Sequence, residues 1–161
     1  MRDGGQGLHD GQGVRGPYRR AGEVAFVDPE SLRPDGPTIE NIRTMVERTA
    51  EFFEGQGCVT CVGPTFSGGY TETVDSGDGD YLTRDTIWDL KVMAKKPKTI
   101  HTLQLYMYYL MGKRSKKSVF DSVVRMGIFN PRLNVVYRLD ATTISQETKD
   151  AVEREVIGYD D

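Results

Sequence analysis

The chain has 161 residues, of which 37% are hydrophobic and 28% charged, and its net charge is −3. This balance excludes a disordered chain, and the length fits one globular domain. No apolar run reaches the roughly 20 residues that a membrane helix needs, and the N-terminus lacks an apolar leader. Since the sequence has only two cysteines, we expect a cytoplasmic protein without membrane contact.

The charge is unevenly distributed along the chain. Residues 1–83 carry seven basic and fourteen acidic residues, a net charge of −7. Residues 84–117 carry nine basic and two acidic residues, a net charge of +7, and residues 118–161 return to −3. A basic segment inside an acidic protein attracts polyanions locally, although a solvated lysine-rich loop would have the same composition.

Two regions are predicted from the change in pattern at Thr38. Residues 1–37 are rich in glycine and proline and have no apolar period, so we expect an irregular segment. From Thr38 to Gly55 apolar residues recur at helical spacing, which predicts a helix capped by Thr38 at the start of a folded domain, residues 38–161. The predicted apolar stripe consists of Ile39, Ile42, Met45, Val46, Thr49 and Phe53. Whether Glu40 or Glu47 of this helix joins a site stays open.

A strand is predicted next, in the segment CVTCVGPTF. Cys58 and Cys61 have C-x-x-C spacing, but one such pair cannot complete a four-ligand zinc site. A redox pair would normally begin a helix, where its thiolate is stabilised, whereas this pair begins a strand. We therefore interpret both cysteines as structural.

Three charged residues occupy a segment whose other residues are typical of a sheet core. Asp80 precedes Tyr81 and Leu82, while Asp89 and Lys91 stand among apolar neighbours. Charged side chains avoid sheet interiors unless their desolvation is compensated. A turn at residues 83–85 predicts a hairpin in which Asp80 and Asp89 approach each other from opposite arms. Since Asp89 and Lys91 are two residues apart, both side chains leave the same face.

A divalent metal ion is the simplest compensation for two facing carboxylates. They would otherwise repel each other, and one pKa would rise. Oxygen ligands without a nearby histidine or cysteine favour Mg²⁺ (or Mn²⁺) over zinc. Such ions contact substrate phosphates, which the neighbouring Lys95, Lys96 and Lys98 could hold, so the segment predicts hydrolysis of a phosphate ester.

A helix is predicted in HTLQLYMYYLMG, after this short basic loop. Gln104 and Tyr108 are four residues apart, so they share one face of the helix and can together touch one nucleic-acid strand. The apolar stripe predicted to pack on the sheet consists of Leu103, Met107, Leu110 and Met111.

The order of these features resembles the PD-(D/E)xK nuclease superfamily. Asp80, then Asp89–Leu90–Lys91, resembles its central motif, and Gln104 and Tyr108 match the Q-x-x-x-Y element of its RecB-like and CRISPR-associated exonuclease branch. The resemblance covers about residues 38–140. Gly79 stands where the motif has its proline, and the cysteines are not arranged for the iron–sulfur cluster that some relatives carry.

The resemblance implies a metal-dependent DNA nuclease with a role in DNA repair or in defence against foreign DNA. Asp80 and Asp89, with the Leu90 carbonyl, would hold the metal. Lys91 would orient the attacking water or stabilise charge on the phosphate, and Gln104 and Tyr108 would position the strand. RNA is left as an alternative substrate.

Two other interpretations compete with this one. A catalytically inactive nucleic-acid-binding or protein-interaction subunit with the same fold would have no reason to keep buried charges. An ordinary hairpin with a surface Gln–Tyr pair would leave the charges in an apolar strand unexplained.

Two further strands are predicted in residues 118–140, around a turn at residues 130–134, and the chain closes with a helix capped by Ser145. The order helix, strands, helix, strands, helix predicts an α/β fold with a mixed central sheet flanked by helices. The resemblance implies that this domain has the restriction-endonuclease-like core.

Overall fold

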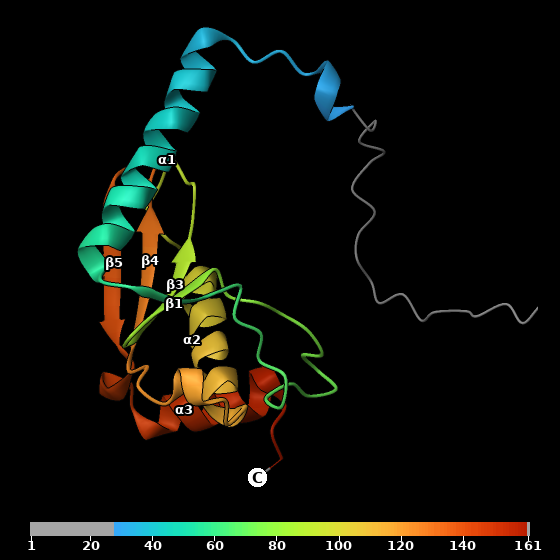
Figure 1. Ribbon diagram of the computed structural model, residues 1–161. Helices are drawn as coiled ribbons and strands as arrows, with labels where there is room; N and C mark the ends of the chain where they lie inside the picture. The colour runs from blue at the N-terminus through green and yellow to red at the C-terminus, as the bar shows by residue number, and fades with distance from the viewer. Residues whose placement is uncertain (1–27, 161) are drawn as a thin grey trace, which may run out of the picture. The chain divides into compact units, whose positions relative to one another are not determined.

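The computed structural model describes residues 28–160. The chain divides into two units, Met1–Pro34 and Asp35–Asp161. The described part of the first unit contains one 3-10 helix, Pro29–Ser31. Most of the irregular segment predicted for residues 1–37 lies outside the described residues. The second unit is an α/β domain with three α-helices among its described residues, α1 (Gly36–Gln56), α2 (Thr99–Arg114) and α3 (Gln146–Ala151) (Figure 1).

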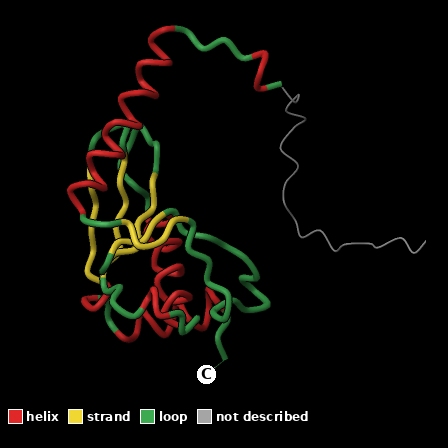
Figure 2. Tube along the Cα trace, viewed as in Figure 1, coloured by secondary structure: helices red, strands yellow, loops and turns green. Residues whose placement is uncertain are grey.

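A mixed five-stranded sheet forms the centre of this domain, as the sequence predicts (Figure 2). The strands β1 to β5 lie in sequence order, and all neighbours are antiparallel except β3 and β4. These two are parallel because α2 carries the chain back between them. The strands are β1 (Val59–Val62), β2 (Tyr81–Thr83), β3 (Thr86–Leu90), β4 (Arg125–Asn130) and β5 (Val135–Asp140).

The predicted hairpin is confirmed in β2 and β3, where Tyr81 pairs with Trp88 and Leu82 with Ile87. Successive side chains on a strand point to opposite faces. Trp88 therefore points to one face of the sheet, whereas Ile87 and Asp89 point to the other. The two faces carry different helices.

The Trp88 face packs against the C-terminal part of α1 through an aromatic cluster. Phe52 stacks on Phe129 with ring centroids 4.1 Å apart, and it makes a T-shaped contact with Trp88 with centroids 4.9 Å apart. Trp88 is completely buried, and its indole Nε1 donates a hydrogen bond to Thr83 Oγ1 at 3.0 Å. A Cβ atom on Gly127 would lie 2.1 Å from the indole, so this position requires glycine.

The helix α1 is confirmed, but its predicted cap and its predicted packing are wrong. The side chain of Asp35, not of Thr38, accepts the capping hydrogen bond, from the Thr38 backbone N–H at 2.8 Å. Asp precedes a Gly-Pro pair that fits the first helical turn, so the helix begins earlier than the apolar pattern does. Phe52 is buried, but Ile42 and Val46 are 50% and 62% exposed, because the sheet covers only the end of the stripe.

The opposite face of the sheet packs against α2. The predicted stripe of Leu103, Met107, Leu110 and Met111 packs on the core, with the first two half-buried, but the prediction is incomplete because Leu105 and Tyr106 are buried as well. The helix is covered both by the sheet and by the C-terminal π-helical segment Val152–Ile157. Apolar residues therefore surround much of α2, and no single stripe marks its buried side.

The last two predicted strands are confirmed as β4 and β5, although the start of that segment, Ser118–Phe120, is a 3-10 helix. The last predicted helix is confirmed as α3, which continues as the π-helical segment. Ser145 caps α3, because its hydroxyl accepts a hydrogen bond from the Thr148 N–H at 3.2 Å. Among residues 28–160, no helix has the length and apolar character that crossing a membrane requires.

Candidate active site

Five predicted site residues lie together on the α2 face of the sheet. Asp80 precedes β2, Asp89 lies near the end of β3, and Lys91 follows that strand directly. Gln104 and Tyr108 occupy the first half of α2. The hairpin brings the two aspartates opposite each other, because the pairing of Tyr81 with Trp88 continues to the next position.

Asp80 is fixed against the end of β3. Its Oδ2 accepts a hydrogen bond from the Leu90 backbone N–H at 2.6 Å. This contact holds the Asp80 carboxylate at the peptide that joins Asp89 to Leu90. The two carboxylates are close enough for the charge on Asp80 to influence the ionisation of Asp89.

Asp89 is a buried carboxylate with an unsatisfied oxygen. Its side chain is 8% exposed, and Lys91 Nζ lies 3.1 Å from Oδ2. That distance makes an ion pair, and apart from Lys91 the described residues give Oδ2 no hydrogen-bond partner. Burial raises the pKa of Asp89 above its usual value, the Lys91 ammonium opposes this rise, and the charge on Asp80 adds to it.

A chain of polar contacts leads from Asp89 to α2. Lys91 Nζ donates a hydrogen bond to Gln104 Oε1 at 3.1 Å, and Gln104 Nε2 donates one to the Tyr108 hydroxyl at 3.0 Å. The Tyr108 ring stacks on Phe66 with centroids 4.9 Å apart. Burial raises the pKa of Tyr108, so its hydroxyl keeps its proton at neutral pH. The Q-x-x-x-Y pair therefore holds Lys91 in place.

The three lysines predicted to hold phosphates lie apart from this chain of contacts. Lys95, Lys96 and Lys98 are exposed on the loop between β3 and α2. Within residues 28–160, the polar contacts of the five site residues include none of these lysines. They border the site at the N-terminal end of α2.

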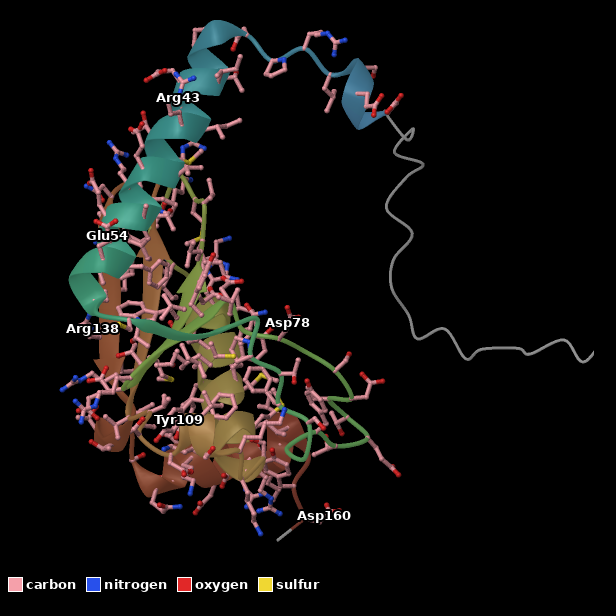
Figure 3. The ribbon with its side chains drawn as sticks, viewed as in Figure 1. Arg43, Glu54, Asp78, Tyr109, Arg138 and Asp160 are labelled. Atoms are coloured by element: carbon pink, nitrogen blue, oxygen red, sulfur yellow. The ribbon has the colours of Figure 1, made fainter. Side chains whose placement is uncertain are left out.

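His101 and Asp78 also lie near the site, and neither was predicted to belong to it. His101 lies close enough to Asp89 to lower the pKa of that carboxyl, and its Nδ1 accepts a hydrogen bond from the Lys98 N–H at 3.1 Å. Its position three residues before Gln104, on the same helix face, could have indicated this. Asp78 raises the pKa of Tyr108 and lies beside α2 (Figure 3). No local spacing links Asp78 to Tyr108.

The carboxylates suit a hard metal ion that keeps most of its waters. The described residues contain no group of three or more His, Cys, Asp and Glu side chains that could hold a metal. Mg²⁺ commonly binds through one or two carboxylates and retains several waters, so Asp80 and Asp89 fit it, and Asp89 Oδ2 is an acceptor without a hydrogen-bond donor. Four-ligand zinc does not fit these two residues.

The glutamates of α1 do not extend this site. Glu40 and Glu47 are exposed, and Glu40 forms an ion pair with Arg43 at 2.6 Å. Because α1 packs on the Trp88 face, it lies on the opposite side of the sheet from Asp89. Cys58 and Cys61 are free thiols in the structure.

No known family model, curated protein or solved structure matches this chain significantly. Its function must therefore be inferred from the geometry of the site.

Proposed function

We propose that this chain is a metal-dependent nuclease that hydrolyses phosphodiester bonds in DNA, with a restriction-endonuclease-like core of the PD-(D/E)xK type. The main support is Asp89, whose buried Oδ2 lacks a hydrogen-bond partner while a second carboxylate lies close by. A buried carboxylate oxygen without a donor costs stability. A bound cation would offset that cost, so the two carboxylates fit the protein ligands of an ion whose other ligands are waters.

The roles of the acidic residues follow from their positions. Asp80 and Asp89, with the Leu90 carbonyl, would hold Mg²⁺ or Mn²⁺. Such an ion, when bound, would supply a water of lowered pKa and would polarise the phosphate. The hydrogen bond from the Leu90 N–H to Asp80 orients one of these carboxylates before any ion binds.

The polar chain on α2 would position Lys91 for the reaction. Lys91 Nζ lies 3.1 Å from both Asp89 Oδ2 and Gln104 Oε1, so an ion pair and a hydrogen bond together fix the end of a flexible side chain. An ammonium group held there can orient the attacking water or stabilise the charge that develops on the phosphate. Tyr108 sets the orientation of the Gln104 amide by accepting from its Nε2.

The exposed lysines would provide attraction that does not depend on base sequence. Lys95, Lys96 and Lys98 lie on the loop that follows Lys91, at one border of the site. Each duplex phosphate that they neutralise lowers the logarithm of the binding constant by about 0.9 per tenfold rise in salt. Replacing all three should therefore flatten the salt dependence of DNA binding.

A second candidate is a catalytically inactive subunit that binds nucleic acid or protein through the same fold. The absence of a three-ligand metal group among residues 28–160 favours it. The ion pair between Lys91 and Asp89 also neutralises part of the site without metal.

An assay of cleavage and metal binding distinguishes the two. Plasmid and single-stranded DNA are incubated with the full chain in Mg²⁺, in Mn²⁺ and in EDTA, and Mn²⁺ binding is measured by calorimetry. We expect cleavage that needs metal, and its loss together with metal binding in Asp80→Asn and Asp89→Asn. Glu47→Gln, an exposed acid on the opposite side of the sheet, is the matched control and should behave as the parent.

Two outcomes would contradict the proposal. DNA binding without cleavage in any metal would favour the inactive subunit. Unchanged metal affinity in both aspartate variants would show that the ion site is misassigned.

A further inference from the structure

The two edges of the sheet differ in how they are protected. At the β1 edge, the pairing with β2 is interrupted by a bulge between Val59 and Cys61, and the strand has only four residues. At the other edge, β5 pairs with β4 over six consecutive residues without interruption. Natural proteins use bulges and short strands to prevent an edge from pairing with another chain. By this criterion β1 is protected and β5 is open.

The open edge is also apolar. Val135, Val136 and Leu139 are 37%, 42% and 39% exposed, although each is a large aliphatic residue. The charged residue in the middle of the strand, Arg138, turns back onto its own domain. Its guanidinium lies 5.0 Å from the Trp88 ring centroid and donates a hydrogen bond to Gln56. The strand therefore lacks the outward lysine or proline that commonly blocks an edge.

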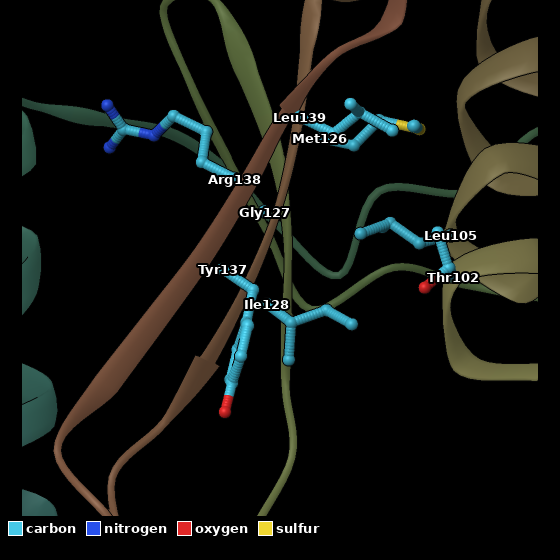
Figure 4. Close-up of a pocket in the computed structure, with 8 residues that line it drawn as sticks. All are labelled: Thr102, Leu105, Met126, Gly127, Ile128, Tyr137, Arg138 and Leu139. Carbon is cyan, nitrogen blue, oxygen red and sulfur yellow. The ribbon is translucent and has the colours of Figure 1, made fainter. Parts of the chain in front are cut away.

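An apolar pocket continues this surface on the α2 face. Tyr137 and Leu139 of β5 line it together with Leu105 of α2 and with Met126 and Ile128 of β4 (Figure 4). Arg138 points away from the pocket, toward the other face of the sheet (Figure 4). The edge thus presents main-chain groups flanked by aliphatic side chains.

We propose that β5 pairs antiparallel with β5 of a second copy of this chain, about a two-fold axis at Tyr137. The two sheets would join into one sheet that continues across both copies. Residues opposite each other in an antiparallel pair lie on the same face of the sheet. The residue at the two-fold axis must therefore pair with its own copy on the partner strand. With the axis at Tyr137, Val135 faces the partner's Leu139, and Val136 faces the partner's Arg138.

The neighbouring registers are less favourable. An axis at Arg138 would place the two Arg138 side chains opposite each other, with like charges in contact. An axis at Val136 would place Leu139 opposite the partner's Leu133, which lies in the turn before the strand. The Tyr137 register pairs aliphatic residues on one face and sets no like charges directly opposite each other.

A second copy of this chain is a suitable partner because both copies would use the same edge, which leaves no open edge for a third copy. Pairing of the same edge on both copies stops at a dimer, whereas pairing of β5 with β1 of another copy would build an open filament. The bulge in β1 blocks that second arrangement. The inference is independent of the proposed nuclease activity.

Sedimentation velocity of the full chain over a concentration series tests the dimer. We expect a mass of twice 18.1 kDa. Val136→Lys places an ammonium opposite the partner's Arg138 and should give a monomer with the parent's circular dichroism. Val46→Lys changes a more exposed valine, on α1, and should remain a dimer. A monomeric parent, or a dimeric Val136→Lys, would overturn the proposal.

Cross-linking tests the register. In a Cys58→Ser, Cys61→Ser background, Tyr137→Cys places two thiols on the axis. Cβ atoms of directly opposite residues lie about 4.5–5.5 Å apart, close to the reach of a disulfide after small adjustment. Mild oxidation should link this variant into a covalent dimer, while Val46→Cys in the same background should stay unlinked. Failure of Tyr137→Cys to link, while its reduced form sediments as a dimer, would overturn the Tyr137 axis.

Discussion

Trp88 and Asp89 are adjacent in β3, and their two faces of the sheet are organised in opposite ways. Trp88 is completely buried, its N–H is satisfied by Thr83, and its ring contacts that of Phe52. Asp89 is almost as buried, yet its Oδ2 has no hydrogen-bond donor among the described residues. One face is a closed apolar core, whereas the other holds a buried carboxylate whose only close cationic partner among the described residues is Lys91. This contrast within two residues is the reason why the proposed ion site is placed on the second face.

The largest expected effect is on the aromatic face. Trp88→Ala should lower the free energy of unfolding by about 3–5 kcal/mol, because it leaves a cavity between Phe52 and Gly127. Urea unfolding followed by circular dichroism measures this. A loss below about 1 kcal/mol would contradict the structural role assigned to that face.

On the polar face, Lys91→Ala should reduce the single-turnover cleavage rate by about two orders of magnitude, a typical loss for one charge-stabilising group. Metal affinity should be equal or higher, because a cation next to the ion site is removed. Stability should change far less than in Trp88→Ala. Lys149→Ala, which breaks a surface pair with Glu153, is the control and should cleave normally. Loss of metal binding along with activity would show that Lys91 has a different role.

Asp89→Asn should increase the stability of the metal-free protein at neutral pH by about 1 kcal/mol, the usual scale of gain when a functional site is relieved of strain. The pKa of Asp89 is raised above 3.8 in the folded state, so its ionised form destabilises the fold at neutral pH. As pH falls through the raised pKa, the folded parent gains a proton and the difference shrinks, and below 3.8 it disappears.

Thermal unfolding at several pH values checks this sign. Asp75→Asn, an exposed residue of the β1–β2 loop, should show no such gain. An Asn variant less stable than the parent at neutral pH would mean that the Lys91 ion pair outweighs the burial of Asp89.

The smallest effect should come from Tyr108→Phe, which removes the hydroxyl that accepts from Gln104. Loss of one such hydrogen bond is equivalent to about 1 kcal/mol, so cleavage should fall about fivefold with metal affinity unchanged. Tyr109→Phe, at the next position on α2, is the matched control. Equal rates in both variants would leave the Q-x-x-x-Y pair without a functional role.

The site was more predictable than the packing around it. Asp89 and Lys91 share a face because of strand geometry, and Gln104 and Tyr108 share one because of helix geometry, so spacing alone places each pair. The turn near Arg84 then brings Asp80 toward Asp89. These inferences depend only on the spacing of residues that are close together in the sequence.

Apart from the cap of α1, which the sequence pattern places at Thr38 and the structure at Asp35, the errors concern contacts between distant segments. The parallel pairing of β3 with β4 leaves no local signal in the sequence, and it decides which helix covers which face. The exposure of Ile42 and Val46 depends on where the sheet ends beneath α1. The burial of Tyr106 depends on the C-terminal segment as well as on the sheet. An apolar pattern reports that a surface is suitable for burial, and the tertiary fold determines which part is covered.

The contacts within the candidate site join residues that are close in sequence, and this should affect the order of folding. Asp80 meets Leu90 across 10 residues, and Lys91 meets Gln104 across 13. By contrast, Thr71 meets Ile157 across 86 residues. The entropy of loop closure grows with the logarithm of length, so the long contact costs about 2 kcal/mol more than the short ones. During folding, the residues of the site should therefore find one another before Thr71 and Ile157 are brought together.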